Sequence, residues 1–350
     1  MSRAGWVAMC GALWIAASFA VPTAWIEEWY SRGLYPRINH LLAPMFGASS
    51  VTWTGIAIIG AVALLIIRAV RRGIRRRRDG KGRTTRALLQ LRDALLVGIF
   101  VYAWFLLTWG LGYRREPIEQ RLDLGAAPVT TAELSDLTDR MVALAVTDSP
   151  REDERDIDRA LSSIRAAMRE VVRRWDGWEP ALTNPKRPPA GLMLATGTLG
   201  AISPWLLEAH VDGALPPTSA ISVAGHELAH VAGYCGEADA DLLGFAAGLE
   251  ADDRFARYAT VIGILRHLRR GLSDERWRDV LSRLPPRAQA DIDEVARAVK
   301  AHRWERLSSM RATVYDSYLR SQGVEAGLRD YDRGVGLLLR ATRRGRVQIP

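Results

Sequence analysis

The chain has 350 residues, of which 48% are hydrophobic, and it carries a formal net charge of +9. This length suits one or two domains with a sizeable core. Residues 68–92 hold eleven Lys and Arg against Asp79 alone, so the rest of the chain is close to neutral. A basic face spread over a folded domain is thereby excluded, and we expect no nucleic-acid partner. The two cysteines, Cys10 and Cys235, also exclude a disulfide framework.

Three apolar segments dominate the first 115 residues, at residues 6–26, 51–68 and 94–113. Each is close to the roughly 20 residues that cross the hydrocarbon core of a bilayer. Trp and Tyr stand near the segment ends, as they do at membrane interfaces. We therefore predict a membrane region over residues 1–115 with three transmembrane helices. The first segment could instead be a cleaved signal peptide, because Ser18-Phe19-Ala20 resembles a small-residue cleavage site.

The arginine-rich loop at residues 68–92 sets the predicted topology. Loops rich in Lys and Arg stay on the cytoplasmic side of the membrane, and contact with anionic lipid headgroups is expected there. Residues 27–50 then form a short external loop, and residues 116–350 form a domain outside the cytoplasm. The sequence thus predicts a multi-pass protein of the cell (inner) membrane, with the lipid bilayer as a partner.

Residues 116–350 have a mixed composition that favours helices. A helix is expected over residues 131–145, because Thr131 resembles an N-cap, and an amphipathic helix over residues 153–175. Residues 192–202 are the best strand candidate, although their glycines weaken it. These patterns predict a mainly α (α+β) fold with a small β element. Further helices are expected over residues 237–249, 253–270, 273–283, 288–307, 311–321 and 331–342.

The most informative stretch is His226-Glu227-Leu228-Ala229-His230. Two histidines four residues apart on a helix lie on one face, about 5–6 Å apart, which suits a shared metal ion. Uncharged residues lead into and out of the motif, as a buried metal helix requires. Glu227 lies between the two ligands and is the predicted general base, acting on a water whose pKa a zinc ion lowers to about 7.

Glu237, seven residues after His230, is the predicted third zinc ligand. Gly233 can end the helix in the left-handed conformation, and Gly236 can keep the turn close to the metal. A metzincin-like ligand ten residues after His226 is excluded, because that position is Gly236, which has no side chain. Three protein ligands leave one position for water, as catalytic zinc requires.

The residues around Glu237 suggest further roles. Asp241, one turn later, can accept a hydrogen bond from the non-ligating nitrogen of one histidine and fix its tautomer. Asp239 or Asp241 could alternatively be the third ligand. Cys235 is interpreted as a packed small residue rather than a soft zinc ligand.

Other candidates lie further from the motif. A second donor is usually needed to stabilise the oxyanion that forms during hydrolysis, and Tyr318, Tyr331 and His302 are candidates for it. Glu208 and His210 precede the metal helix closely and are candidates for contact with the substrate.

Several stretches, spread over nearly the whole chain, together form a recognisable set of motifs: Tyr30 to Pro36, Trp109 to Arg114, His226 to Gly233, Glu237 to Asp241, Tyr315 to Leu319, Gly323, Gly327, Tyr331 and Leu337 to Leu339. In these stretches the chain resembles an uncharacterised bacterial membrane family, domain of unknown function 3810, whose members look like gluzincin-type metalloproteases. The resemblance implies a zincin-like domain behind the membrane helices. The family tends to have Asn where Asp241 stands, and a polar pair where Val231 and Ala232 stand.

The sequence therefore predicts a membrane-anchored zinc metallopeptidase that hydrolyses a peptide or protein of the envelope or the extracytoplasmic space. An alternative is a non-catalytic membrane receptor or assembly factor stabilised by zinc. Glu227 argues against it, because structural zinc has no need of that carboxylate and prefers four filled positions with thiolates. A further alternative is a sensor that cleaves itself or one partner, although no cytoplasmic effector domain follows the spans.

Overall fold

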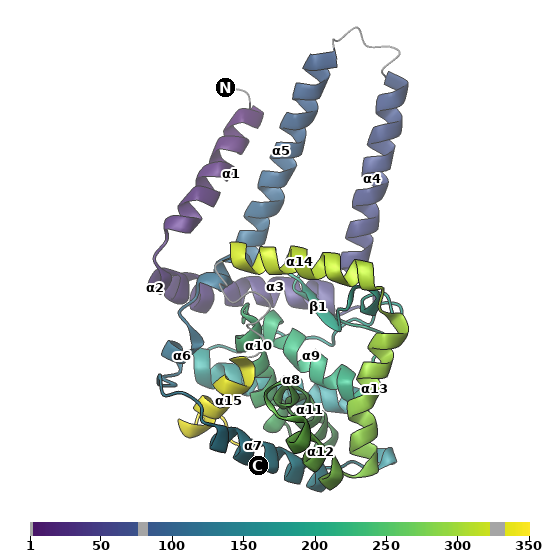
Figure 1. Ribbon diagram of the computed structural model, residues 1–350. Coiled ribbons are helices and arrows are strands. Elements are labelled where there is room, and N and C mark those ends of the chain that lie inside the picture. The colour runs from purple at the N-terminus through teal and green to yellow at the C-terminus, as the bar shows by residue number, and fades with distance from the viewer. Residues whose placement is uncertain (1–2, 76–82, 323–332) are drawn as a thin grey trace.

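The computed structural model describes residues 3–75, 83–322 and 333–350. The chain is mainly helical, and the described residues contain a single two-stranded antiparallel sheet. Three long helices, α1 (Arg3–Ala20), α4 (Trp53–Arg75) and α5 (Arg83–Thr108), project from one side of a helical body (Figure 1). The mainly α fold with a small β element is thus confirmed.

The projecting helices α4 and α5 carry apolar side chains on surfaces that no described part of the chain covers. Ile59 is 71% exposed, and Phe100 is 69% exposed. Among the described residues, the segment Gln90–Thr108 of α5 is long and apolar enough to cross a membrane, and Trp53–Arg68 forms a shorter apolar helix. These surfaces indicate association with a membrane. The central part of the arginine-rich loop, residues 76–82, lies outside the described residues.

The segment expected as an external loop over residues 27–50 is instead helical and belongs to the body. It contains α2 (Thr23–Trp25), the π-helical stretch η1 (Ile26–Leu34) and α3 (Tyr35–Gly47). Pro36 stands in the first turn of α3, where its missing N–H costs no hydrogen bond. Tyr35 and Asn39 both donate hydrogen bonds of 2.9 Å to the carbonyl of Val231. This segment therefore packs against the end of the metal-motif helix.

Two helices at the centre of the body, α9 (Pro217–Val231) and α10 (Glu237–Leu249), position the candidate site. Almost every residue of α10 is buried, because its sequence is apolar on nearly all sides. The helices α8 (Ile157–Asp176) and α11 (Arg254–Leu268) pack around this pair. The other elements of the body are η2 (Gly110–Arg114), α6 (Ile118–Arg121), α7 (Thr131–Thr147), η3 (Glu152–Glu154), η4 (Leu194–Thr196), η5 (Arg269–Gly271), α12 (Asp274–Arg283), α13 (Pro286–His302), α14 (Glu305–Ser321) and α15 (Gly334–Arg343).

Helices form in each of the regions expected for residues 116–350, with two differences. The break expected at residues 308–310 lies at residues 303–304, between α13 and α14, and residues 331–332 of the last expected helix lie outside the described residues. Thr130 rather than Thr131 caps α7, through a capping box with Glu133. The expected strand at residues 192–202 is largely wrong. Only β1 (Gly200–Ser203) is extended, and it pairs with β2 (Glu208–Val211), which the sequence pattern did not reveal. Residues 194–196 form the 3-10 turn η4 instead, followed by Gly197 in the left-handed region.

Candidate metal centre

The helix α9 presents His226 and His230 on one face toward the start of α10. Their ring centroids lie 4.7 Å apart and their planes are nearly perpendicular. Pro217 begins α9, where its fixed φ is compatible with a first helical turn. The spacing of four residues places both imidazoles on adjacent turns, as the sequence predicts.

The chain reverses between the two helices at Gly233. This residue has a φ of +92°, a conformation that a residue with a Cβ rarely adopts. A Cβ at this position would also stand 2.7 Å from the ring of Tyr35. The reversal lets Glu237 open α10 directly opposite the imidazoles, with only 1% of its surface exposed.

The side chains of His226, His230 and Glu237 converge on one point. One ligand atom from each lies within 4.8 Å of the other two. Glu237 Oε2 is 3.1 Å from His226 Nε2 and 3.5 Å from His230 Nε2. Of the alternative third ligands, Asp241 contacts the far side of His226, and Asp239 lies 3.9 Å from Arg121. Two imidazoles and one carboxylate that meet in this way can hold a metal ion.

The other ring nitrogen of each histidine is held by a hydrogen-bond acceptor. His226 Nδ1 lies 2.8 Å from Asp241 Oδ1, and His230 Nδ1 lies 2.7 Å from the carbonyl of Tyr234. A carbonyl oxygen can only accept, so Nδ1 of His230 must carry the hydrogen. In the neutral ring the lone pair then sits on Nε2, the atom that faces Glu237. These contacts fix the tautomer that a metal ligand needs.

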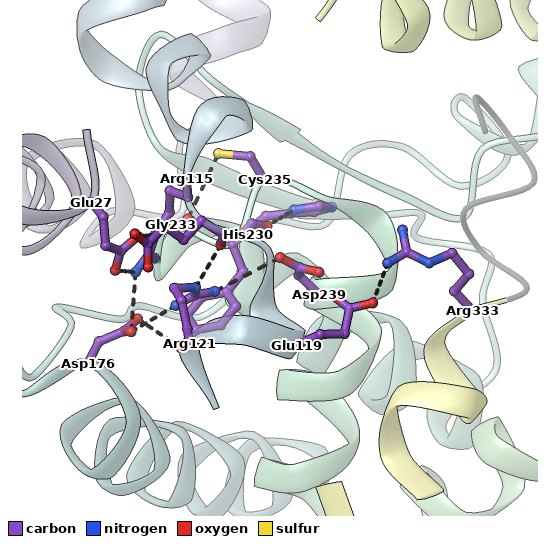
Figure 2. Close-up of polar contacts among 12 residues, drawn as sticks. Glu27, Arg115, Glu119, Arg121, Asp176, His230, Gly233, Cys235, Asp239 and Arg333 are labelled. Carbon is purple, nitrogen blue, oxygen red and sulfur yellow. Dashed lines mark hydrogen bonds and ion pairs between the residues drawn. The ribbon is translucent and has the colours of Figure 1, made fainter. Parts of the chain in front are cut away.

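Tyr234 is itself held by a cluster of buried charges behind the site. Its hydroxyl donates a hydrogen bond of 2.9 Å to Asp176, which also pairs with Arg121 at 2.8 Å and with Arg115 at 3.2 Å. Arg115 pairs further with Glu27 of η1 at 2.8 Å (Figure 2). We name Glu27, Arg115, Arg121 and Asp176 the charge cluster. It ties the segment after α1 to the backbone that holds His230.

Glu227 lies beside the three candidate ligands and is 5% exposed. Its Oε2 atom is buried and has no hydrogen-bond partner among the described residues. Burial raises the pKa of this carboxyl, and the nearby Glu237 carboxylate also raises it, against the opposing effect of the two imidazoles. A Cβ on Gly200 would stand 2.5 Å from Glu227 Oε1, so only glycine lets β1 run this close. A buried carboxylate with an oxygen that lacks a partner, beside three candidate metal ligands, can exchange a proton with a bound water.

Tyr315 of α14 is a site residue that the sequence interpretation missed. Its hydroxyl donates a hydrogen bond to Glu237 Oε1, the oxygen that does not face the imidazoles. Burial raises the pKa of this phenol and the Glu237 carboxylate raises it further, so it stays protonated and donates. Tyr315 precedes the predicted candidate Tyr318 by three residues, one helical turn. Because residues three apart lie on one face of a helix, this spacing in the sequence indicates that Tyr315 lies beside Tyr318.

We expect Tyr315→Phe to weaken metal binding by about 10- to 100-fold, because ligands that lose an orienting hydrogen bond lose affinity on this scale. Zinc competition with a chelator of known affinity measures the change. Tyr318→Phe is the matched control, since its hydroxyl lies 3.4 Å from the hydroxyl of Tyr113 and contacts no candidate ligand. Equal affinities in the two variants would contradict a role for Tyr315 in holding Glu237.

The other oxyanion candidates have different positions. Tyr318 lines the same cavity as the three candidate ligands, where it packs between Phe105 and Tyr113. His302 ends α13, and its Nδ1 lies 2.9 Å from the carbonyl of Ala298. It does not line either of the two cavities that His226 and Glu227 line. Tyr331 lies outside the described residues.

Glu208 and His210, the predicted substrate contacts, do not line these cavities. The carboxylate of Glu208 accepts hydrogen bonds from the backbone N–H groups of Trp53, at 3.1 Å, and Thr54, at 2.8 Å. It therefore caps the first turn of α4, where free N–H groups attract a carboxylate. His210 pairs with Ala201 in the sheet, and its Nε2 lies 3.3 Å from Glu208. Glu208 therefore fastens the body to α4, and His210 lies beside it in the sheet.

Two cavities meet at His226 and Glu227. The first, of about 620 Å³, is lined by apolar side chains of α5 and β1 and by Tyr315 and Tyr318 of α14. The second, of about 430 Å³, is more polar and is lined by Arg266, His267 and Arg270. His226 and Glu227 line both cavities, so the two cavities adjoin at these residues.

The comparisons with known proteins bear on the chain as a whole. No curated protein and no solved structure matches it. One family, described as "Protein of unknown function (DUF3810)", matches residues 30–339. This range includes α3, the apolar helices α4 and α5, both strands and the three candidate ligands His226, His230 and Glu237. Because the match covers most of its length, the chain belongs to the DUF3810 family, as the resemblance of its motifs led us to expect.

Proposed function

We propose that this protein is a membrane-anchored, zinc-dependent metallopeptidase. The observation that carries the proposal is the convergence of His226, His230 and Glu237 beside Glu227, whose buried Oε2 atom has no hydrogen-bond partner among the described residues. The cluster lines a cavity large enough for a peptide segment, since small-molecule sites span about 300–1,000 Å³.

The donor set fits zinc. Two imidazole nitrogens and one carboxylate oxygen are a combination found at catalytic zinc sites, where a fourth position stays open. With each Nδ1 bonded to an acceptor, both Nε2 atoms face Glu237, and the lone pairs that these atoms offer in the neutral rings would be stabilised by a cation at the centre. Zinc, when bound, would polarise a water molecule and the carbonyl of the substrate.

The chain's own residues would supply the remaining chemistry. Glu227 would accept a proton from the attacking water while the oxygen of that water bonds to the carbonyl carbon. It would return the proton to the amide nitrogen as the C–N bond breaks, which yields an acid and an amine. Burial raises the pKa of Glu227, and this suits a group that must hold a proton between the two transfers.

The strand β1 supports a peptide as the substrate. Gly200, Ala201 and Ile202 line the first cavity, and among the described residues β1 pairs only with β2. Its outer edge can therefore accept an extended peptide as an added strand, through main-chain hydrogen bonds. Gly200 also lines the second cavity, so a peptide along β1 would pass directly over Glu227.

Metal removal tests the proposal. We expect the purified chain to bind one zinc ion, and dialysis against a chelator to remove both the metal and peptide hydrolysis. Elemental analysis gives the metal content, and a quenched-fluorescent peptide library gives the activity. Activity that survives complete loss of metal would refute a metal-dependent mechanism. Zinc that binds without any hydrolysis would favour a structural role.

We also propose that α1, α4 and α5 span the cell membrane three times, with the loop at residues 68–92 in the cytoplasm and the body outside it. The apolar exposed surfaces of α4 and α5 support this arrangement, as does the arginine-rich loop. An alkaline phosphatase fusion after Pro350 is expected to be active, and a green fluorescent protein fusion there to be dark. The reverse result would place the body in the cytoplasm.

A further inference from the structure

The first cavity extends far along the apolar helix α5. Gly98, Val101 and Phe105 line it, and all three lie within the segment Gln90–Thr108 that can cross a membrane. Gly98 is ten residues from the end of that segment, or about 15 Å at 1.5 Å per residue. The cavity that contains His226 and Glu237 therefore reaches along the segment well away from the body.

The helix α14 forms the opposite wall of this cavity. The ring of Tyr318 lies 6.2 Å from that of Phe105 and 6.1 Å from that of Tyr113, which holds α14 beside the last turns of the apolar segment. α14 lies across the body at the level where α5 leaves it (Figure 1). The turn between β1 and β2 is also fastened to α5, because Trp104 donates a hydrogen bond of 3.0 Å to the carbonyl of Trp205.

α14 carries an apolar stripe that nothing in the described part of the chain covers. Trp304, Leu307, Met310 and Val314 are 68%, 39%, 66% and 70% exposed. Their spacing of three, three and four residues places them along one side of the helix. A helix with such a stripe lies in the headgroup region of a bilayer with its apolar side facing the acyl chains. Since α14 lies at the end of a membrane-spanning segment, the fitting partner of the stripe is the lipid surface.

A second apolar surface lies on α3, at the same level of the molecule as α14 (Figure 1). Leu41 is 65% exposed and Met45 is 55% exposed, whereas Tyr35 and Leu42 of the same helix are buried. Both helices therefore lie at the side of the body from which the long helices project (Figure 1).

We propose that the substrate is a membrane-anchored polypeptide that reaches the metal centre from the bilayer side, between α5 and α14. The apolar cavity wall would receive the residues next to the anchor, and β1 would hold the adjoining extended segment over Glu227. This inference rests on the proposed peptidase function.

A bulky residue at the outer end of the cavity tests the entrance. A Cβ on Gly98 meets nothing within 4 Å, so Gly98→Phe can be accommodated and fills space in the cavity. Gly60 of α4 also meets nothing within 4 Å and does not line the cavity, so Gly60→Phe is the matched control. Each full-length variant is reconstituted in phosphatidylethanolamine and phosphatidylglycerol liposomes. The probes are a randomised quenched-fluorescent decapeptide library, either soluble or joined to a membrane-spanning Leu/Ala segment.

We expect Gly98→Phe to slow cleavage of the anchored library by about tenfold or more, because a clash at the entrance discriminates against that substrate, and to change cleavage of the soluble library less than about twofold. Gly60→Phe should change neither rate. Equal rates for Gly98→Phe and Gly60→Phe on the anchored library would overturn the proposed entrance. An equal loss on both libraries would also overturn it, because the cavity would then serve every substrate. If the unmodified protein cleaves neither library, the peptidase function itself fails.

The lipid contact of α14 has a test that does not depend on catalysis. In a Cys10→Ser background, a fluorophore is attached at Val314→Cys on the stripe or at Ser309→Cys on the polar side. Spin-labelled lipids should quench the probe at position 314 severalfold more than the probe at position 309. Equal quenching at both positions would refute the membrane contact of the stripe, whatever the activity measurements give.

Discussion

Glu227→Gln should abolish peptide hydrolysis and leave the metal bound. The amide is nearly the same size as the carboxylate but cannot accept the proton of the attacking water, and loss of a general base slows hydrolysis by about 10²- to 10⁴-fold. Oε2 of Glu227 has no hydrogen-bond partner among the described residues, so the change breaks no contact of that atom. His226, His230 and Glu237 are untouched, which predicts an unchanged zinc content.

The measurement combines elemental analysis with the initial rate of cleavage of the soluble peptide library. Glu170→Gln is the control, because Glu170 is a half-exposed carboxylate on α8 that pairs with Arg173. It should retain full activity. If Glu227→Gln cleaves peptides as fast as the unmodified protein, Glu227 is not the base and the peptidase proposal fails.

The second large effect is expected at Asp176→Ala, in the charge cluster. Arg115 and Arg121 have 6% and 1% of their side chains exposed, and both pair with this carboxylate. Its removal leaves the buried guanidinium of Arg121 without its closest carboxylate and takes one of two carboxylates from Arg115, which keeps Glu27. Breaking a buried charge pair in this way costs about 3–5 kcal/mol of folding free energy. Thermal unfolding of the protein in detergent measures the loss. Glu170→Gln again serves as control, since an exposed ion pair contributes about 0–1 kcal/mol.

The charge cluster also predicts a dependence of stability on pH. Burial alone would raise the pKa of Asp176, but the positive charges of Arg115 and Arg121 outweigh burial and lower it from its ordinary 3.8. The pKa of Glu27 is likewise lowered from 4.5, as Arg115 outweighs burial. A lowered folded-state pKa gives stability that is complete above the ordinary value and is lost as pH falls through the folded value. The melting temperature should therefore fall upon acidification below about pH 4, and less steeply in Asp176→Ala. An equally steep fall in both proteins would contradict this account.

Asp176→Ala should affect the metal centre as well, because Tyr234 links the two. In this variant the hydroxyl of Tyr234 loses its acceptor Asp176, while the carbonyl of Tyr234 still accepts the hydrogen bond from His230 Nδ1. Zinc affinity should therefore drop together with stability, by about tenfold or more if the ring orientation is lost. The chelator competition used for Tyr315→Phe measures this change in the same units.

The sequence alone was sufficient to predict how those residues of the candidate site that lie close together along the chain are arranged. His226 and His230 share a helix face because the helical repeat fixes that face over four residues. Gly233 predicts the reversal that brings Glu237 opposite them, and its φ is indeed positive. The long apolar runs predicted α4 and α5 for the same reason, since composition over a single stretch decides whether a helix can face lipid.

Only the tertiary structure decided which distant residues surround that local unit. Tyr315 reaches Glu237 from 78 residues away, and Asp176 reaches Tyr234 from 58 residues away, through packing that no spacing encodes. Glu208 lies close to the motif in the sequence, and only the fold shows that its carboxylate points at the first turn of α4. The physical reason is that backbone periodicity acts over one or two helical turns, whereas the partner of a buried polar group is set by which helices share a core.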